Sequence, residues 1–119
     1  MKITIYHNPQ CSKSRKTLAI IRGSGVEPGI IEYLTYAPTA ATVLELSGML
    51  GIPVARLLRR GETTFKNATD LPALDDDAAL AAWLEQNPKV LERPIVVDED
   101  SAAAVIGRPP ENVLELLNK

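Results

Sequence analysis

The chain has 119 residues, of which 45% are hydrophobic and 24% are charged, values typical of one soluble domain with a modest core. Its net charge of −2 and its few aromatic residues exclude the basic surface and the base-stacking platforms of nucleic-acid-binding proteins. No apolar run approaches the roughly 20 residues of a membrane span, and no signal-peptide pattern precedes the first predicted strand; we therefore expect a cytoplasmic protein that binds neither nucleic acid nor membrane.

The first elements predicted along the chain are a strand, a loop, a helix and a second strand. Residues 2–6 alternate between polar and apolar side chains, residues 7–11 form a turn, and residues 12–24 have helical spacing. Residues 29–34 are almost continuously apolar, which is typical of a strand covered on both faces. Together these elements predict a βαβ unit with parallel strands.

The middle of the chain, about residues 38–88, is predicted to be helical. One helix ends at Gly51, a short helix follows Pro53, and residues 62–74 are weakly periodic and are expected to be irregular. The acidic run at residues 75–77 suits the N-cap and first turn of a further helix. A metal site is the alternative, but no other ligand residues gather around this run.

The final third of the chain predicts two strands and a helix. Residues 94–98 and residues 102–107 flank a short polar turn and are expected to pair as an antiparallel hairpin. Pro109 and Pro110 precede the last helix. Three apolar side chains of this helix are expected to face the sheet: Val113, Leu114 and Leu117.

This order of elements predicts the fold class. A parallel strand pair, followed by helices and then by an antiparallel hairpin with a closing helix, gives an α/β fold with a four-stranded mixed sheet. That arrangement is thioredoxin-like. We therefore expect residues 1–119 to form one domain, with a helical insertion of about residues 38–88 between the two halves of the sheet.

Cys11 is the only cysteine in the chain, and it lies where the first predicted strand ends and the first helix begins. Backbone N–H groups and the helix dipole at such a position lower a thiol pKa from about 8.5 to roughly 3.5–7.5. We expect a reactive thiolate nucleophile rather than a buried structural cysteine. One cysteine and one histidine form neither an internal disulfide nor a zinc site. We therefore expect no bound metal or cofactor, and any resolving thiol must come from another molecule.

The first turn after Cys11 carries three cations, Lys13, Arg15 and Lys16, where the helix dipole favours anions. Each cation there costs about 0.3–1 kcal/mol of helix stability, and local rules are broken most often at functional sites. We expect an anion at this loop, either the thiolate, an oxyanion substrate or both. The alternative is that these side chains point into solvent.

Other side chains of the loop have open roles. His7, the only histidine, lies four residues before Cys11; it stabilises the thiolate, orients the loop, or is a surface imidazole bonded to the backbone. Asn8 and Ser12 are able to cap the helix or to bond the loop backbone.

Arginines lie at the ends of several predicted elements. Arg59 or Arg60 ends the short third helix, and Arg93 and Arg108 each precede a proline, which disfavours helix at the arginine. The guanidinium group binds tetrahedral oxyanions through two parallel hydrogen bonds. From these residues alone, convergence on Cys11 and simple solvation both stay open.

Four segments of the chain closely resemble the glutaredoxin-coupled, ArsC-type arsenate reductases. They are the loop from Tyr6 to Arg15, the segment Leu57-Leu58-Arg59, the block Arg93-Pro94-Ile95-Val96-Val97 and the sequence Gly107-Arg108-Pro109-Pro110. The resemblance runs through essentially the whole chain with the same spacing of landmarks. In particular, the chain is similar to the short branch of that family, which ends soon after the last helix.

The resemblance implies a thioredoxin-like fold, a cis peptide bond between Arg93 and Pro94, and a nucleophile at Cys11. It makes His7 a helper of the thiolate. The oxyanion-binding arginines that it implies are Arg59, Arg93 and Arg108, with Arg60 as a neighbour able to take the place of Arg59. Substrate-binding positions are expected in the loop at Asn8, Ser12, Lys13, Ser14 and Arg15.

The activity implied is reduction of arsenate to arsenite, with glutathione as co-substrate, glutaredoxin as partner and a monomeric enzyme. Two alternatives remain. Cys11-Ser12-Lys13-Ser14 has the Cys-x-x-Ser spacing of single-thiol glutaredoxin-like sites, so a glutathione-linked redox enzyme without an oxyanion substrate is possible; three converging arginines would favour the reductase. The related Spx-type regulators bind RNA polymerase, but they usually carry a second cysteine in the loop, which this chain lacks.

Overall fold

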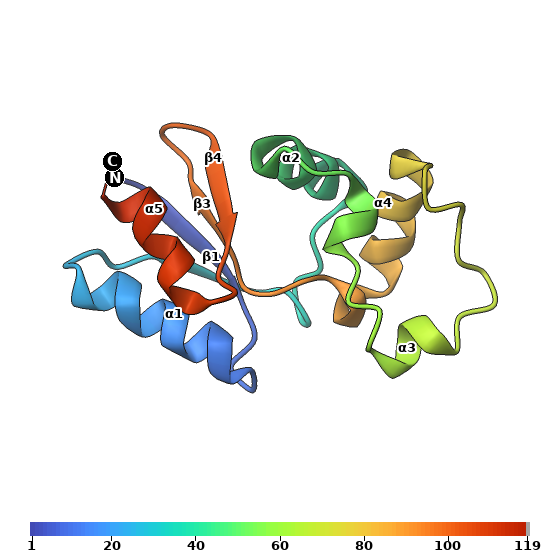
Figure 1. The fold of residues 1–119 in the computed structure, drawn as a ribbon, viewed down its shortest axis with the longest axis horizontal. Coiled ribbons are helices and arrows are strands. Elements are labelled where there is room, and N and C mark those ends of the chain that lie inside the picture. The colour runs from blue at the N-terminus through green and yellow to red at the C-terminus, as the bar shows by residue number, and fades with distance from the viewer. Residues whose placement is uncertain (119) are drawn as a thin grey trace. The chain divides into compact units, whose positions relative to one another are not determined.

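The computed structural model describes residues 1–118 and divides them into two compact units (Figure 1). The first unit consists of residues 1–33 and residues 93–118, and the second is Leu34–Glu92. The first unit therefore combines both ends of the sequence, and it contains Cys11.

The first unit is built on a four-stranded sheet in the order β2-β1-β3-β4. β1 pairs with β2 in parallel, and the pairs β1–β3 and β3–β4 are antiparallel. This topology confirms the predicted thioredoxin-like mixed sheet. The elements of this unit are β1 (Ile3–His7), α1 (Ser12–Gly23), β2 (Gly29–Glu32), β3 (Ile95–Asp98), β4 (Ala103–Ile106), the 3₁₀ helix η3 (Pro110–Val113) and α5 (Leu114–Leu117).

The register of the strands brings three connecting segments to the same end of the sheet. Tyr6 pairs with Ile95, and Ile95 pairs with Ile106. Because β3 is antiparallel to both neighbours, the carboxyl ends of β1 and β4 lie beside the amino end of β3. The loop after β1, the Arg93–Pro94 segment and the Gly107–Arg108 segment therefore leave the sheet together.

α1 and α5 lie on the same face of the sheet (Figure 1). Between them and the strands is a cluster of buried side chains: Ile3, Ile5, Ile21, Val96, Val113 and Leu116. Full burial of one such side chain contributes about 1.5–3 kcal/mol, so this cluster fixes α1 against β1 and β3. The amino end of α1 is thereby held at the same end of the sheet as the three connecting segments.

The second strand differs from its prediction. β2 ends at Glu32, two residues before the expected Leu34, and its side chains are mostly exposed, with Ile30 at 41%. The expectation that both faces of this strand are covered was wrong, because β2 is an edge strand. A continuous apolar run does not distinguish a central strand from an edge strand.

The last helix also corrects the sequence analysis. It starts as the 3₁₀ helix η3 and becomes α-helical only at α5. Because a 3₁₀ helix has three residues per turn, Pro110, Val113 and Leu116 share the buried face. Leu114, which we expected to face the sheet, is exposed, whereas Leu117 is partly buried and packs against the core cluster, as expected.

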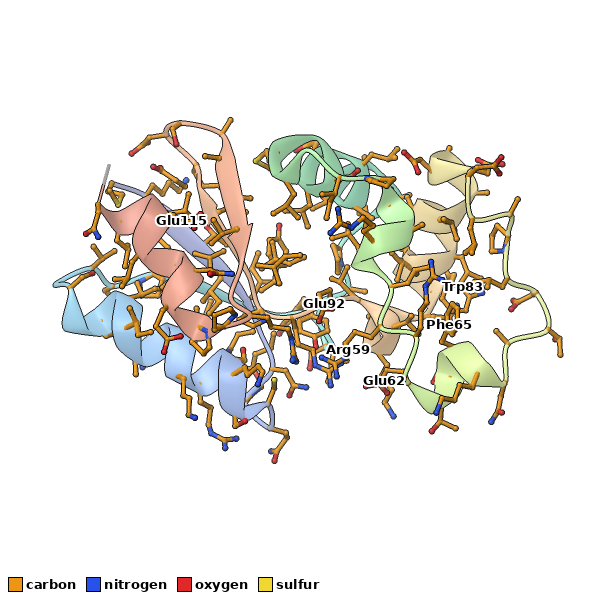
Figure 2. The ribbon with its side chains drawn as sticks, in the orientation of Figure 1. Arg59, Glu62, Phe65, Trp83, Glu92 and Glu115 are labelled. Carbon is orange, nitrogen blue, oxygen red and sulfur yellow. The ribbon has the colours of Figure 1, made fainter. Side chains whose placement is uncertain are left out.

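The second unit is helical, with a short antiparallel bridge between Leu58 and Leu91. Asp76 is the N-cap of α4, and its side chain accepts the N–H of Ala79 at 3.1 Å, as the acidic run predicted. Trp83, labelled in Figure 2, is buried and donates from Nε1 to Asp70 at 3.0 Å. The elements of this unit are α2 (Ala40–Leu50), η1 (Val54–Leu57), α3 (Thr63–Lys66), α4 (Asp77–Gln86) and η2 (Pro88–Val90).

Residues 1–118 contain neither a candidate membrane span nor a candidate metal site. No helix in this range has the length and apolar character needed to cross a bilayer. No group of three or more histidine, cysteine, aspartate or glutamate side chains in this range is placed to hold a metal ion.

Candidate functional site

Cys11 is the N-cap residue of α1, with extended backbone angles of φ −92° and ψ 121°. Its own N–H donates to the carbonyl of Asn8 at 3.0 Å, which closes a tight turn after β1. The side chain is half-buried. Cys11 therefore lies at the junction of strand and helix, as predicted from the sequence.

Hydrogen bonds of ordinary length fix the loop that carries Cys11. The Asn8 side chain accepts the N–H of Gln10 at 3.0 Å, and the Asn8 N–H donates to Ser14 Oγ at 3.1 Å. Arg15 Nη1 donates to the carbonyl of Pro9 at 2.8 Å. The first turn of α1 therefore holds the loop at two points. Asn8 shapes the loop, which was one of the two roles considered for it.

His7 is buried at the end of β1 and its Nδ1 lies 2.6 Å from Ser14 Oγ. Burial lowers the pKa of His7; the Glu32 charge opposes this effect, and Arg22 and Arg15 add to it. The direction of this hydrogen bond depends on the tautomer of the imidazole, and the Ser14 oxygen also accepts the Asn8 N–H. His7 is therefore buried and bonded to the loop, and it is not the surface imidazole considered above. Its roles in orienting the loop and in stabilising the thiolate stay predictions.

Two arginines reach Cys11 from the neighbouring segments. Arg108, directly after Gly107, places Nη2 at 3.6 Å from Cys11 Sγ and donates from Nε to the carbonyl of Arg93 at 2.6 Å. The Arg93 side chain also hydrogen-bonds the Cys11 thiol. Both guanidinium groups therefore converge on one sulfur atom, because the strand order and register bring their segments to the same end of the sheet.

Opposing effects act on the pKa of Cys11. Partial burial raises the pKa, but the hydrogen bonds from the Ser14 N–H, the Arg93 side chain and the Lys13 N–H, together with the charge of Arg108, outweigh burial. The net effect is a pKa below the ordinary value for a thiol. This combination of N–H donors at a helix N-terminus and nearby cations is the environment of a reactive cysteine.

The remaining loop residues are exposed at the start of α1. The side chains of Ser12, Lys13 and Lys16 lie on the surface, and the contribution of Lys13 to the Cys11 thiol comes from its backbone N–H. Among the hydrogen bonds of the described residues, neither the Lys13 nor the Lys16 ammonium group contacts Cys11.

Arg59 and Arg60 belong to the second unit. Arg59 is half-buried, with Nη1 at 3.3 Å from Glu92 Oε1 and Nε at 3.8 Å from Glu62 Oε1 (Figure 2). Arg60 is exposed. Two carboxylates therefore neutralise Arg59 within its own unit, and the role that the resemblance implies for it in oxyanion binding stays a prediction.

The backbone at both Arg–Pro steps is unusual. Arg93–Pro94 is cis, as the resemblance implied, and Arg108–Pro109 is cis as well, which the sequence analysis did not anticipate.

The comparisons with known proteins agree with this geometry. The model of the ArsC family matches residues 6–116. The uncharacterized protein YfgD of Escherichia coli K12 is 45% identical over 119 residues, covering 98% of this chain and 97% of that protein. The arsenate reductase of Haemophilus influenzae is 39% identical over 118 residues, covering 98% of this chain and 100% of that protein. A solved structure of an arsenate reductase from Vibrio cholerae superposes with a TM-score of 0.84 at 41% identity, covering 97% of each chain. The chain belongs to the ArsC family.

Proposed function

We propose that this protein reduces arsenate to arsenite, with Cys11 as the nucleophile and with glutathione and glutaredoxin as the source of electrons. The observation that carries this proposal is the convergence of two guanidinium groups, Arg93 and Arg108, on one thiol of lowered pKa. A helix N-terminus alone is sufficient to favour a thiolate. Two additional arginines supply charge for a second, larger anion.

The charge and shape of arsenate fit this arrangement. At neutral pH arsenate is an oxyanion with several acceptor oxygens, and a guanidinium group binds such oxygens in pairs. The backbone N–H groups of Lys13 and Ser14 are donors at the same helix end. Arg93, Arg108 and these donors would hold the oxyanion with its central atom facing the sulfur, and they would stabilise the charge that develops during attack.

The reaction then proceeds by two nucleophilic steps. The Cys11 thiolate attacks arsenic(V), forming a sulfur–arsenic bond, and one oxygen leaves as hydroxide or, after protonation, as water. The thiolate of glutathione next attacks the Cys11 sulfur, and the electron pair of the sulfur–arsenic bond passes to arsenic. Arsenic leaves as arsenite, reduced by two electrons, and Cys11 is left in a disulfide with glutathione.

An external reductant completes the cycle. The chain has no second cysteine, so the disulfide between Cys11 and glutathione is opened by another thiol, which we assign to glutaredoxin. Such a sequence of thiols requires a reducing compartment, and we propose that the protein works in the cytoplasm.

A coupled assay tests this function. Purified protein is mixed with arsenate, glutathione, glutaredoxin, glutathione reductase and NADPH, and NADPH oxidation is followed. We expect oxidation that depends on both arsenate and the protein and that disappears in Cys11→Ser. Arg93→Ala should retain a nucleophile but need more arsenate, since loss of a charge-assisted hydrogen bond typically costs about 1.5–3 kcal/mol. Unchanged kinetics in Arg93→Ala would contradict the oxyanion site.

A second function has one observation in its favour. The Cys-x-x-Ser spacing and the N–H donors at Cys11 would also serve a glutathione-linked redox enzyme with no oxyanion substrate. A mixture without glutaredoxin, containing the protein, glutathione, glutathione reductase and NADPH, separates the two functions when a small glutathione mixed disulfide replaces arsenate. NADPH oxidation with the mixed disulfide and none with arsenate would establish this second function.

A further inference from the structure

Gly107 lies against its neighbours more closely than any other residue type would allow. A Cβ atom added to Gly107 would be 2.5 Å from Thr17 Oγ1, 2.8 Å from Pro94 Cγ and 3.1 Å from Thr17 Cγ2. Distances below about 3.0 Å are essentially never found for real Cβ atoms. An alanine at this position would therefore push the segment after β4 away from α1, from Pro94 or from both.

Thr17 is the rigid side of this contact. Its side chain is fully buried, and Oγ1 donates to the carbonyl of Lys13 at 2.8 Å. This hydrogen bond fixes the orientation of the hydroxyl and hence of the methyl group. Lys13 belongs to the turn whose N–H groups bond the Cys11 sulfur. The contact between Gly107 and Thr17 therefore joins the turn that holds the thiol to the segment that carries Arg108.

The segment that carries Arg108 is fixed on its other sides as well. The Gly107 N–H donates to the carbonyl of Pro94 at 2.9 Å. The Asn112 side chain donates from Nδ2 to the carbonyls of Ile106 at 3.3 Å and Arg108 at 3.1 Å. Its amide group thus holds the residues before and after Gly107 in one conformation.

We propose that Gly107, Thr17 and Asn112 are positioning residues that set the distance between the Arg108 guanidinium and the Cys11 sulfur, and with it the capture of the oxyanion. To reach ordinary contact at 3.4 Å from Thr17 Oγ1, a Cβ on residue 107 must move by about 0.9 Å, the difference between 3.4 and 2.5 Å. Arg108 Nη2 is already 3.6 Å from the sulfur. We expect this shift to carry the guanidinium away from the sulfur, and an increase of that size would lengthen the contact to about 4.5 Å, beyond hydrogen-bond distance.

The effect on substrate rests on the proposed function, whereas the effect on the thiol does not. Cys11 is the only cysteine, so alkylation by iodoacetamide reports on this one sulfur without substrate. The alkylation rate is measured as a function of pH, and arsenate kinetics are measured on the same variants. Together these measurements separate the effect on the thiol from the effect on substrate binding. If arsenate proves not to be a substrate, the alkylation profile still decides whether these residues position Arg108.

The central comparison is Gly107→Ala against Gly23→Ala. Gly23 ends α1 in the same unit, and a Cβ added there would meet no atom within 4 Å, so its alanine variant should behave as the wild type. Gly107→Ala should shift the alkylation profile to higher pH and lower the rate at pH 6 at least fivefold. In the arsenate assay it should raise KM at least fivefold, with a smaller effect on kcat.

A second substitution tests whether the contact itself is responsible. Thr17→Ala in the Gly107→Ala background removes the atoms at 2.5 and 3.1 Å, while the ring of Pro94 is able to adjust by changing its pucker. We expect the double variant to recover at least half of the lost rate on a logarithmic scale. A general loss of stability is distinguished by circular dichroism, because the variants are compared under conditions in which all are folded, where only a changed thiol environment shifts the alkylation profile.

Asn112 keeps the proposal testable if Gly107→Ala does not fold. Asn112 is half-buried, and Asn112→Leu removes the amide donor to two carbonyl oxygens without adding a charge. This variant should shift the alkylation profile in the same direction as Gly107→Ala. If folded Gly107→Ala or, in its place, Asn112→Leu has an alkylation profile within twofold of the wild type, the proposed positioning role is wrong.

Discussion

Replacing Arg108 by alanine removes a positive charge 3.6 Å from the Cys11 sulfur. At this separation a pair of unit charges interacts by about 1 kcal/mol in bulk water and by about 5 kcal/mol at an effective dielectric constant of about 20. Cys11 is half-buried, so the true value lies between these limits. Even the lower limit corresponds to a roughly fivefold loss of thiolate at a pH below the thiol pKa.

Alkylation of Cys11 measures this loss directly. The rate constant with iodoacetamide is determined from pH 4 to pH 9 for the wild type, Arg108→Ala, Arg108→Lys and the control Arg56→Ala. Arg56 is exposed and lies in the second unit, so its variant should match the wild type. The profile of Arg108→Ala should move to higher pH, with a rate at pH 6 at least fivefold lower.

Arg108→Lys separates charge from geometry. A lysine keeps the positive charge but loses the planar group that donates both to the Arg93 carbonyl and to Cys11. We expect an alkylation profile between those of the wild type and Arg108→Ala. Overlapping profiles for the wild type and Arg108→Ala would refute the electrostatic account of the thiol.

Three further predictions concern stability, measured by chemical denaturation. Burial lowers the pKa of His7 in the folded protein, so the unfolded state binds more protons at a pH between this lowered pKa and about 6.5, the ordinary histidine pKa. The free energy of unfolding should therefore fall as the pH drops through this window. His7→Gln should show a smaller fall, and equal slopes for the wild type and the variant would contradict this explanation. Asp76→Ala removes the N-cap of α4 and should cost about 0.5–2 kcal/mol, whereas its exposed neighbour Asp75→Ala should cost less. Arg59→Ala loses two partly exposed ion pairs and should cost under about 1 kcal/mol; a larger loss would mean that Arg59 is primarily structural.

The position of Cys11 was predictable because it depends on local chemistry. An alternating strand, a proline-containing turn and a helical repeat define the junction in the sequence itself. The N-cap residue was not predicted, because Asn8 and Ser12 were the caps considered and the N-cap is Cys11. The mixed sheet was predictable for a similar reason, since the order of strands and helices permits few topologies. Predicting that Arg93 and Arg108 converge on Cys11 requires the register of three strands, which residue patterns alone do not provide.

The parts that sequence reasoning missed depend on tertiary contacts. Exposure of β2 follows from its place at the edge of the sheet, and the buried Leu116 follows from the 3₁₀ start of the last helix. Neither the exposure of β2 nor the burial of Leu116 can be predicted from the hydrophobic periodicity of the sequence. Gly107 and Asn112 carry no reactive group, so nothing in the sequence links them to Cys11 until the contacts are seen.

The most direct test of the central claim is the state of Cys11 after reaction with arsenate and reduced glutathione, without glutaredoxin and without oxygen. Intact-protein mass spectrometry is used to count glutathione bound per chain. The proposed mechanism predicts one glutathione in a disulfide with Cys11, formed only when arsenate is present, because arsenate is then the sole oxidant. Unmodified protein in the presence of arsenate, with ready modification by oxidised glutathione, would show that Cys11 serves thiol exchange and that arsenate is not its substrate.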